Sequence, residues 1–151
     1  MEALFDTWNI HDRINQYILN ALDENHLVAQ SASKGRTVGE QFAHMHNVRL
    51  MWLKASAPEL MEGLHKIEKT DITLQGLIQN FTESGLSILK LLKKGFEENR
   101  IKNFKPHPQA FLGYLISHES HHRGQILLSL KQSGIILDKK ILFGIWEWGV
   151  R

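Results

Sequence analysis

The sequence lacks cysteine altogether, has only three prolines, and contains no long apolar run. Without cysteine there are no disulfide bonds and no thiolate ligands, so a bound metal ion would have to be held by imidazole, carboxylate or water. A membrane helix needs about 18 or more consecutive apolar residues, and the N-terminus lacks the basic start and apolar stretch of a signal peptide. We therefore expect a cytoplasmic protein with no membrane partner.

A large excess of one charge is missing as well. The 18 basic and 16 acidic side chains leave a net charge of +2, and no basic block is longer than two residues. This pattern argues against nucleic acid as a partner. With 42% hydrophobic and 23% charged residues, the chain has the composition of a globular protein. Its length predicts a single domain over residues 1–151.

Apolar residues recur at three- and four-residue steps in four segments, and this periodicity predicts four long helices. Their expected limits and caps are 7–23, 38–55 after a capping box of Thr37 and Glu40, 74–98 after Thr73 or Asp71, and 108–132 between Pro108 and Gly134. No alternating strand pattern is present. The predicted fold class is therefore all-α, a four-helix bundle with a short C-terminal fifth helix in the apolar tail at 135–151.

The connections between the predicted helices do not determine how the helices are arranged. Residues 58–71 form a long connection, with a local helical turn expected near residues 59–64, and residues 99–107 form a second connection. These lengths allow either a simple up-and-down order or a crossover, and periodicity does not decide between the two.

The most informative segment is 117–125, inside the fourth predicted helix. It has no apolar residue larger than glycine, although apolar runs flank it on both sides. A helix with this pattern should pass beside a polar interior site. His118 and His122 stand four residues apart in it, which places them about 40° and about 6 Å apart on one helix face. This spacing suits two imidazoles that share one metal ion.

Two interpretations of this pair need no metal: buried neutral histidines with hydrogen-bonding neighbours, or an exposed polar patch. Two unpaired imidazoles in a core would be costly, and a cation removes that cost. A metal site also needs a third protein ligand. The second helix offers His44 and His46, which lie about 200° apart around its axis, so only one of them can face the same centre. Spacing alone does not choose between them.

Residues 118–122 also fit the H-E-x-x-H pattern of zinc peptidases, in which the glutamate is the general base. The match is formal, because those enzymes take a third ligand from downstream, where this chain has only two carboxylates and no histidine. Glu119 and Arg123 can instead form an ion pair along the helix. His121 lies one position away from the face that carries His118 and His122. It is either a pocket residue or an exposed one. The isolated histidines are interpreted as surface or loop residues: His11, His26, His65 and His107.

The chain resembles the DinB-like family of metal-binding helical bundles, which includes the bacterial YfiT-like thiol transferases. The resemblance covers nearly the whole chain and is strongest in the fourth helix. The matching segments are residues 37–45 with Arg49 and residues 52–53 in the second helix, residues 118–126 in the fourth, and residues 144–148 in the tail.

The resemblance implies a metal site made by His44, His118 and His122, with His44 rather than His46 as the third ligand. It also implies a homodimer, and a small-molecule substrate in the form of a low-molecular-weight thiol that the metal activates. Zinc, nickel, manganese and iron all fit such a site. Residues within a turn or two of these ligands are the expected pocket or supporting residues: His46, Asn47, Trp52, Glu119, His121, Arg123 and Gln125.

Three functions from different classes follow. The first is a metal-dependent enzyme, either a thiol transferase or a hydrolase that uses metal-activated water. The second is a metal-binding protein without turnover, acting in stress response or metal handling. The third is a helical interaction module in which the histidines are incidental.

Overall fold

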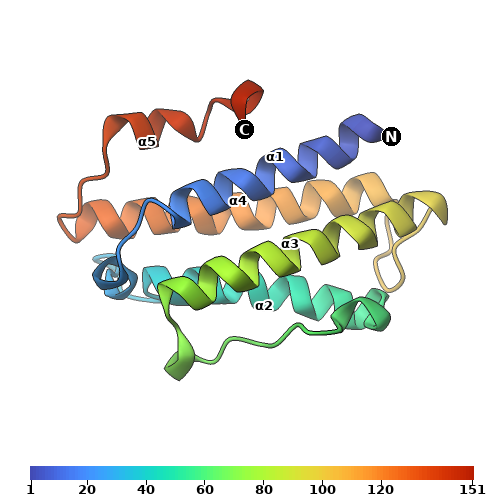
Figure 1. Cartoon of the computed structure of the whole chain (residues 1–151), viewed down its shortest axis with the longest axis horizontal. Helices are drawn as coiled ribbons and strands as arrows, with labels where there is room; N and C mark the ends of the chain where they lie inside the picture. The colour runs from blue at the N-terminus through green and yellow to red at the C-terminus, as the bar shows by residue number, and fades with distance from the viewer.

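The computed structural model describes residues 1–151 and consists of helices joined by loops (Figure 1). The α-helices are α1 (Glu2–Leu19), α2 (Val38–Ser56), α3 (Leu74–Glu97), α4 (Pro108–Gln132) and α5 (Lys139–Gly144). Short 3₁₀ segments are η1 (Glu24–Val28), η2 (Pro58–Met61), η3 (Lys69–Asp71) and η4 (Trp148–Val150). The predicted all-α fold with a short fifth helix is confirmed. None of the helices combines the length and apolar character that crossing a membrane would require.

The caps predicted for the long helices are present. Thr37 Oγ1 accepts a hydrogen bond from the backbone N–H of Glu40 at 3.2 Å, and Glu40 Oε2 accepts one from the N–H of Thr37 at 2.9 Å. This reciprocal capping box fixes the start of α2, the helix that carries His44. Of the two candidates for α3, Thr73 is the cap, because its hydroxyl accepts from the N–H of Gly76 at 3.1 Å.

The predicted limits of α1, residues 7–23, are wrong at both ends. The helix begins at Glu2, because Leu4 and Phe5 pack against an apolar cluster beside Trp8. It ends at Leu19 rather than near Asp23, since Asp23 is the cap of η1 and its N–H donates to the ring of His26 at 3.0 Å. Local capping thus ends α1 before its apolar periodicity runs out.

The order of the helices includes a crossover. In Figure 1, α1 and α4 run in one direction and α2 and α3 in the other. The segment 57–73 runs along the outside of the bundle and joins α2 to the parallel helix α3. Both α1 and α2 pack beside α3 and α4, which places α1 and α2 diagonally across the bundle. Helices α2 and α4, the carriers of the candidate ligands, are therefore direct neighbours.

Asn47 and His46 were candidates for the pocket, but their side chains bind the crossover segment to α2. The Asn47 side chain donates to the carbonyl of Ile67 at 2.9 Å and accepts from its N–H at 3.0 Å. The His46 ring lies 2.9 Å from the carbonyl of His65 through Nε2 and 3.1 Å from Ser84 Oγ through Nδ1. Both nitrogens of His46 are thus engaged away from His118 and His122, and His46 is a buried structural residue.

The core consists of two apolar clusters with polar side chains between them along each helix. On α4, for example, Leu115 belongs to one cluster and Ile126 to the other. The buried polar residues between the clusters are His11, Asp12 and Asn15 on α1, His46 and Arg49 on α2, Ser84 on α3, and Glu119 and His122 on α4. The polar block at 117–125 is the part of α4 that crosses this layer, so the polar interior predicted from it is confirmed.

Candidate metal centre

Three histidines converge between α2 and α4. His44 comes from α2, and His118 and His122 come from successive turns of α4. Each offers one ring nitrogen, and these nitrogens all lie within 4.8 Å of one another. Nε2 of His118 and Nε2 of His122 are 3.2 Å apart. The His44 ring centre lies 4.6 Å from that of His122 and 5.5 Å from that of His118.

Neighbouring side chains hold two of these rings in place. Nδ1 of His122 lies 2.6 Å from Oε1 of Gln41, a buried residue three positions before His44 on α2. Because an amide oxygen can only accept, Nδ1 carries the proton and Nε2 is left with its lone pair toward the cluster. The ring of Tyr114 stacks beside that of His118 at 6.1 Å. Nδ1 of His118 is buried and has no hydrogen-bond partner.

Sequence reasoning did not single out Gln41 as a functional residue. A signal for it was present, since Gln41 and His44 stand three residues apart and so share one face of α2.

The surroundings keep all three rings neutral. Burial lowers the pKa of His44 below its ordinary value, and the positive charge of Arg36 adds to the effect. Burial also lowers the pKa of His118, despite an opposing contribution from Glu119. The pKa of His122 falls to about 4, first through burial and then through the neighbouring His118 and His44. At neutral pH each ring can therefore offer a lone pair, which a metal ligand requires.

The donor set fits a divalent cation. Two imidazole nitrogens bound to one zinc ion at about 2.05 Å in tetrahedral geometry lie about 3.3 Å apart, close to the 3.2 Å between the Nε2 atoms of His118 and His122. The three nitrogens lie within 4.8 Å of one another, so only small movements of the side chains would bring all three to bonding distance of one ion. Neutral ligands would leave the ion its full positive charge and at least one open position.

The sequence matches a known protein family over most of its length. A family model described as the DinB family matches residues 1–136. This chain belongs to the DinB family. A solved structure of a DinB-like protein from Bacillus cereus ATCC 10987 is 20% identical, with a TM-score of 0.72 over 91% of this chain and 95% of that chain. At that identity the likeness shows the fold alone. No curated protein matches the sequence.

Directly beside the histidines, the DinB bundle buries an ion pair between Arg49 and Glu119. Both side chains are fully buried, and Arg49 donates to the Glu119 carboxylate through Nε at 2.7 Å and through a terminal nitrogen at 2.8 Å. Asn15 donates to the same carboxylate at 2.7 Å, and Nε2 of His11 lies 3.0 Å from it. Arg49 also pairs with Asp12 at 2.7 Å. One guanidinium thus joins helices that lie diagonally across the bundle.

This network corrects two interpretations of the sequence. Burial by itself would raise the pKa of Glu119, but Arg49 and His11 outweigh it and hold that pKa below its usual range. Glu119 is thus ionised and saturated with donors inside the core, which does not suit the general base of a peptidase. It does not pair with Arg123 either. Arg123 donates to Asn15 at 2.8 Å and to Ser120 at 3.0 Å, because Arg49 already occupies the carboxylate.

The other expected pocket residues have separate positions. Trp52 packs edge-on against Phe104, Phe111 and Tyr114, in an aromatic cluster one turn beyond His118. His121 is exposed, with its ring centre 5.2 Å from that of His122. Gln125 lines a polar cavity together with Gln41. His11, interpreted as a surface residue, is instead fully buried in the ion-pair network.

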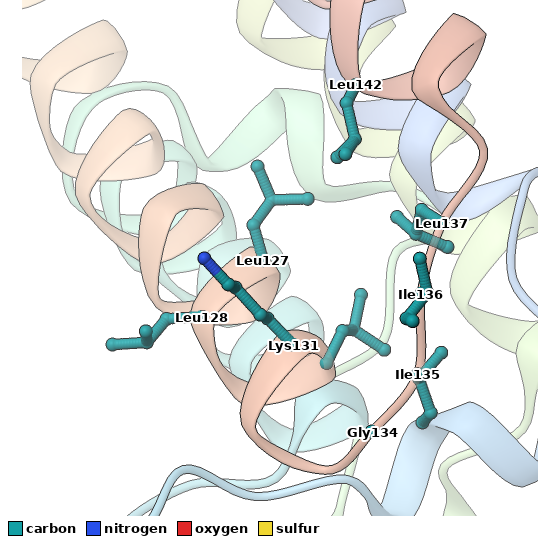
Figure 2. Close-up of a pocket in the computed structure, with 9 residues that line it drawn as sticks. Leu127, Leu128, Lys131, Gly134, Ile135, Ile136, Leu137 and Leu142 are labelled. Atoms are coloured by element: carbon teal, nitrogen blue, oxygen red, sulfur yellow. The ribbon is translucent and has the colours of Figure 1, made fainter.

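The largest cavity of the bundle lies away from the histidines. It is an apolar cleft of about 680 Å³ between the end of α4 and the segment leading into α5. Figure 2 shows Leu127 and Leu128 on one side of it and Leu137 and Leu142 on the other. None of the candidate ligands lines this cleft, so its size is not an argument for the metal centre. Large exposed apolar surfaces often mark contacts with other molecules.

Proposed function

We propose that this chain binds a divalent metal ion through His44, His118 and His122 and activates a small thiol for transfer to an electrophile. The observation that carries the proposal is the convergence of three neutral imidazole nitrogens within 4.8 Å, from two neighbouring helices of a DinB fold. Imidazole ligands suit zinc, nickel and iron, and the sequence leaves manganese open as well. The homodimer implied by the family resemblance stays a prediction.

The proposed reaction replaces a leaving group on carbon. The thiol loses its proton to solvent, a new sulfur–carbon bond forms, and the bond to the leaving group breaks with its electron pair. A divalent cation, when bound, stabilises the deprotonated form of a thiol or of water. The protein contributes the orientation of the ligands: Gln41 fixes the His122 ring, and Tyr114 packs against the His118 ring. The carboxylate of Glu119 is occupied by Arg49, so it offers no general base of the zinc-peptidase kind.

An activity assay with mercaptoethanol and chlorodinitrobenzene tests this proposal. The products are a thioether, chloride and a proton, and the aryl thioether is followed by its absorbance. We expect zinc-loaded protein to exceed chelated protein by roughly 100-fold, since a Lewis acid contributes several kcal/mol. The double variant His118→Ala with His122→Ala should fall to the chelated rate. His121→Gln, which changes the exposed neighbouring histidine, should keep the native rate.

Other outcomes of this assay favour the alternatives. If the protein binds zinc but the zinc-loaded and chelated samples react at the same rate, the metal does not catalyse this reaction. That result would favour a metal-binding protein without turnover. Zinc-dependent cleavage of a nitrophenyl ester without any zinc-dependent thioether formation would contradict thiol transfer and support the hydrolase.

The hydrogen bond between Gln41 and His122 gives a second expectation for the same site. Removing a partner that orients a ligand histidine typically lowers metal affinity by about 10–100-fold. We expect Gln41→Ala to show a loss of this size in zinc competition against a chelator of known affinity. Gln41→Glu, which keeps an acceptor, should retain most of the affinity. Gln125→Ala serves as the control, because Gln125 lines the same cavity without contacting a ligand. Native affinity in Gln41→Ala would show that this bond does not position His122.

A further inference from the structure

A polar cavity of about 230 Å³ lies at the end of the bundle where α2 begins and α4 ends (Figure 1), and its wall includes Gln41, the partner of His122. Lys34 and Arg36 reach it from the loop before α2, together with the hydroxyls of Ser31 and Ser33. Helices α2 and α4 contribute the remaining polar groups, Gln41, Gln125 and Ser129. The cavity is thus lined by hydrogen-bond donors from three parts of the chain.

The loop that carries the two cations is tied down at several points. The N–H of Val38 donates to the carbonyl of Ala29 at 2.9 Å, which closes the base of the loop. The N–H of Ala32 donates to Gln132 Oε1 at 2.8 Å, and this bond anchors the loop to the end of α4. Ser31 Oγ donates to the carbonyl of Lys34 at 2.9 Å within the loop. These bonds shape the cavity before any ligand is present.

The positive charge in the cavity is not compensated. Lys34 and Arg36 form no ion pair, and no acidic side chain lines the cavity. Glu40, in the first turn of α2, lines the neighbouring cavity together with Arg36, but it is already engaged by Lys69 at 2.9 Å and by the N–H of Thr37 at 2.9 Å. Two cations and several hydroxyl and amide groups therefore face the cavity without an anion.

The cavity lies next to the metal centre, with Gln41 between the two. Gln41 forms part of its wall and holds the His122 ring through the 2.6 Å contact described above. Arg36 lines both this cavity and a neighbouring one that His44 also lines. The charge of Arg36 contributes to lowering the pKa of all three histidines, as expected for a cation close to the cluster.

We propose that this cavity binds an anionic group, a carboxylate or a phosphate, of the small molecule whose thiol reacts at the three histidines. This inference rests on the proposed function, and it adds a substrate class to it. Arg36 offers a planar donor fork that matches both kinds of oxyanion, and Lys34 adds a second positive charge. The anion would hold the substrate at one end of the cavity while its thiol points toward the imidazoles.

The test compares two thiols of similar size, mercaptopropionate and mercaptopropanol, by calorimetric titration of zinc-loaded protein. We expect mercaptopropionate to bind about 3- to 10-fold more tightly, and the preference to shrink as salt rises from about 0.02 to 0.5 M. Arg36→Gln and Lys34→Gln should each reduce the preference, and the double variant should abolish it. Lys105→Gln makes an equal charge change on an exposed residue of the loop between α3 and α4, and it should leave the preference intact. That loop lies at the opposite end of the bundle from the start of α2 (Figure 1).

A second arm uses inorganic phosphate and succinate with metal-free protein, and so reads the cavity without the metal. Binding of either anion that is lost in Arg36→Gln supports the inference, and the tighter of the two identifies the group. The two proposals also fail separately. Stoichiometric zinc with no preference for mercaptopropionate would overturn the anion site alone. Arg36-dependent phosphate binding by a protein that takes up no zinc would support the anion site and overturn the metal site.

Discussion

Replacing Glu119 with glutamine should lower the free energy of unfolding by about 3–5 kcal/mol, the usual cost of breaking a buried ion pair from one side. The change keeps the volume of the side chain but removes its charge. Arg49, which is fully buried, would then have only Asp12 as an anionic partner. The measurement is urea-induced unfolding of metal-free protein, so that any effect on the metal centre does not enter the result.

An exposed glutamate on α3 provides the matched control. Glu97→Gln makes the same chemical change at a residue without an ion pair and should alter the stability by no more than about 0.5 kcal/mol. An equally small effect at Glu119 would contradict the role of the Arg49–Glu119 pair as the link across the bundle. The same pair of variants also separates this role from a peptidase-like role, in which Glu119→Gln would abolish activity while leaving stability unchanged.

Zinc should stabilise the native protein strongly and His44→Ala only weakly. A ligand at about 1,000 times its dissociation constant adds about 4 kcal/mol to the stability of the folded state. For a chain of this size that corresponds to a rise in Tm of roughly 8–16 °C. Removing one of three ligands should lower the zinc affinity enough to eliminate most of this rise. His44 is only partly buried, so the alanine variant should remain folded.

Two other histidines serve as controls for this thermal shift. His121→Gln changes an exposed histidine next to the cluster, and His46→Gln changes the buried neighbour of His44 that contacts Ser84 and His65. Both variants should show the full zinc-dependent rise, although His46→Gln should start from a lower Tm. A full rise in His44→Ala together with its loss in His46→Gln would reverse the assignment of the third ligand.

Much of the fold follows from local signals in the sequence. Helical periodicity and the capping groups Thr37 and Thr73 place α2 and α3 nearly where the structure has them. The block at 117–125 predicts a polar layer in the interior, because a helix that is apolar at both ends and polar in between must cross one. The pairing of His118 with His122 follows from spacing within one helix, and the two Nε2 atoms do lie 3.2 Å apart.

The features that sequence reasoning missed depend on how the helices are rotated and packed. Whether His44 or His46 faces α4 depends on the orientation of α2 about its own axis, which packing against α3 and the crossover decides. Only the resemblance to a known family selected His44. The partner of Glu119 was equally hidden, since Arg49 lies on another helix, whereas Arg123 was the nearer candidate along the sequence. The crossover itself leaves no periodic signal.

A crystal structure of the protein grown with one equivalent of zinc, with anomalous data collected at the zinc absorption edge, tests the three-histidine site directly. We expect a single anomalous peak between α2 and α4, with nitrogens of His44, His118 and His122 at about 2.0–2.1 Å from it. A zinc ion held by other residues, or no peak at the three histidines in protein that carries stoichiometric zinc, would show that these histidines are not the metal site.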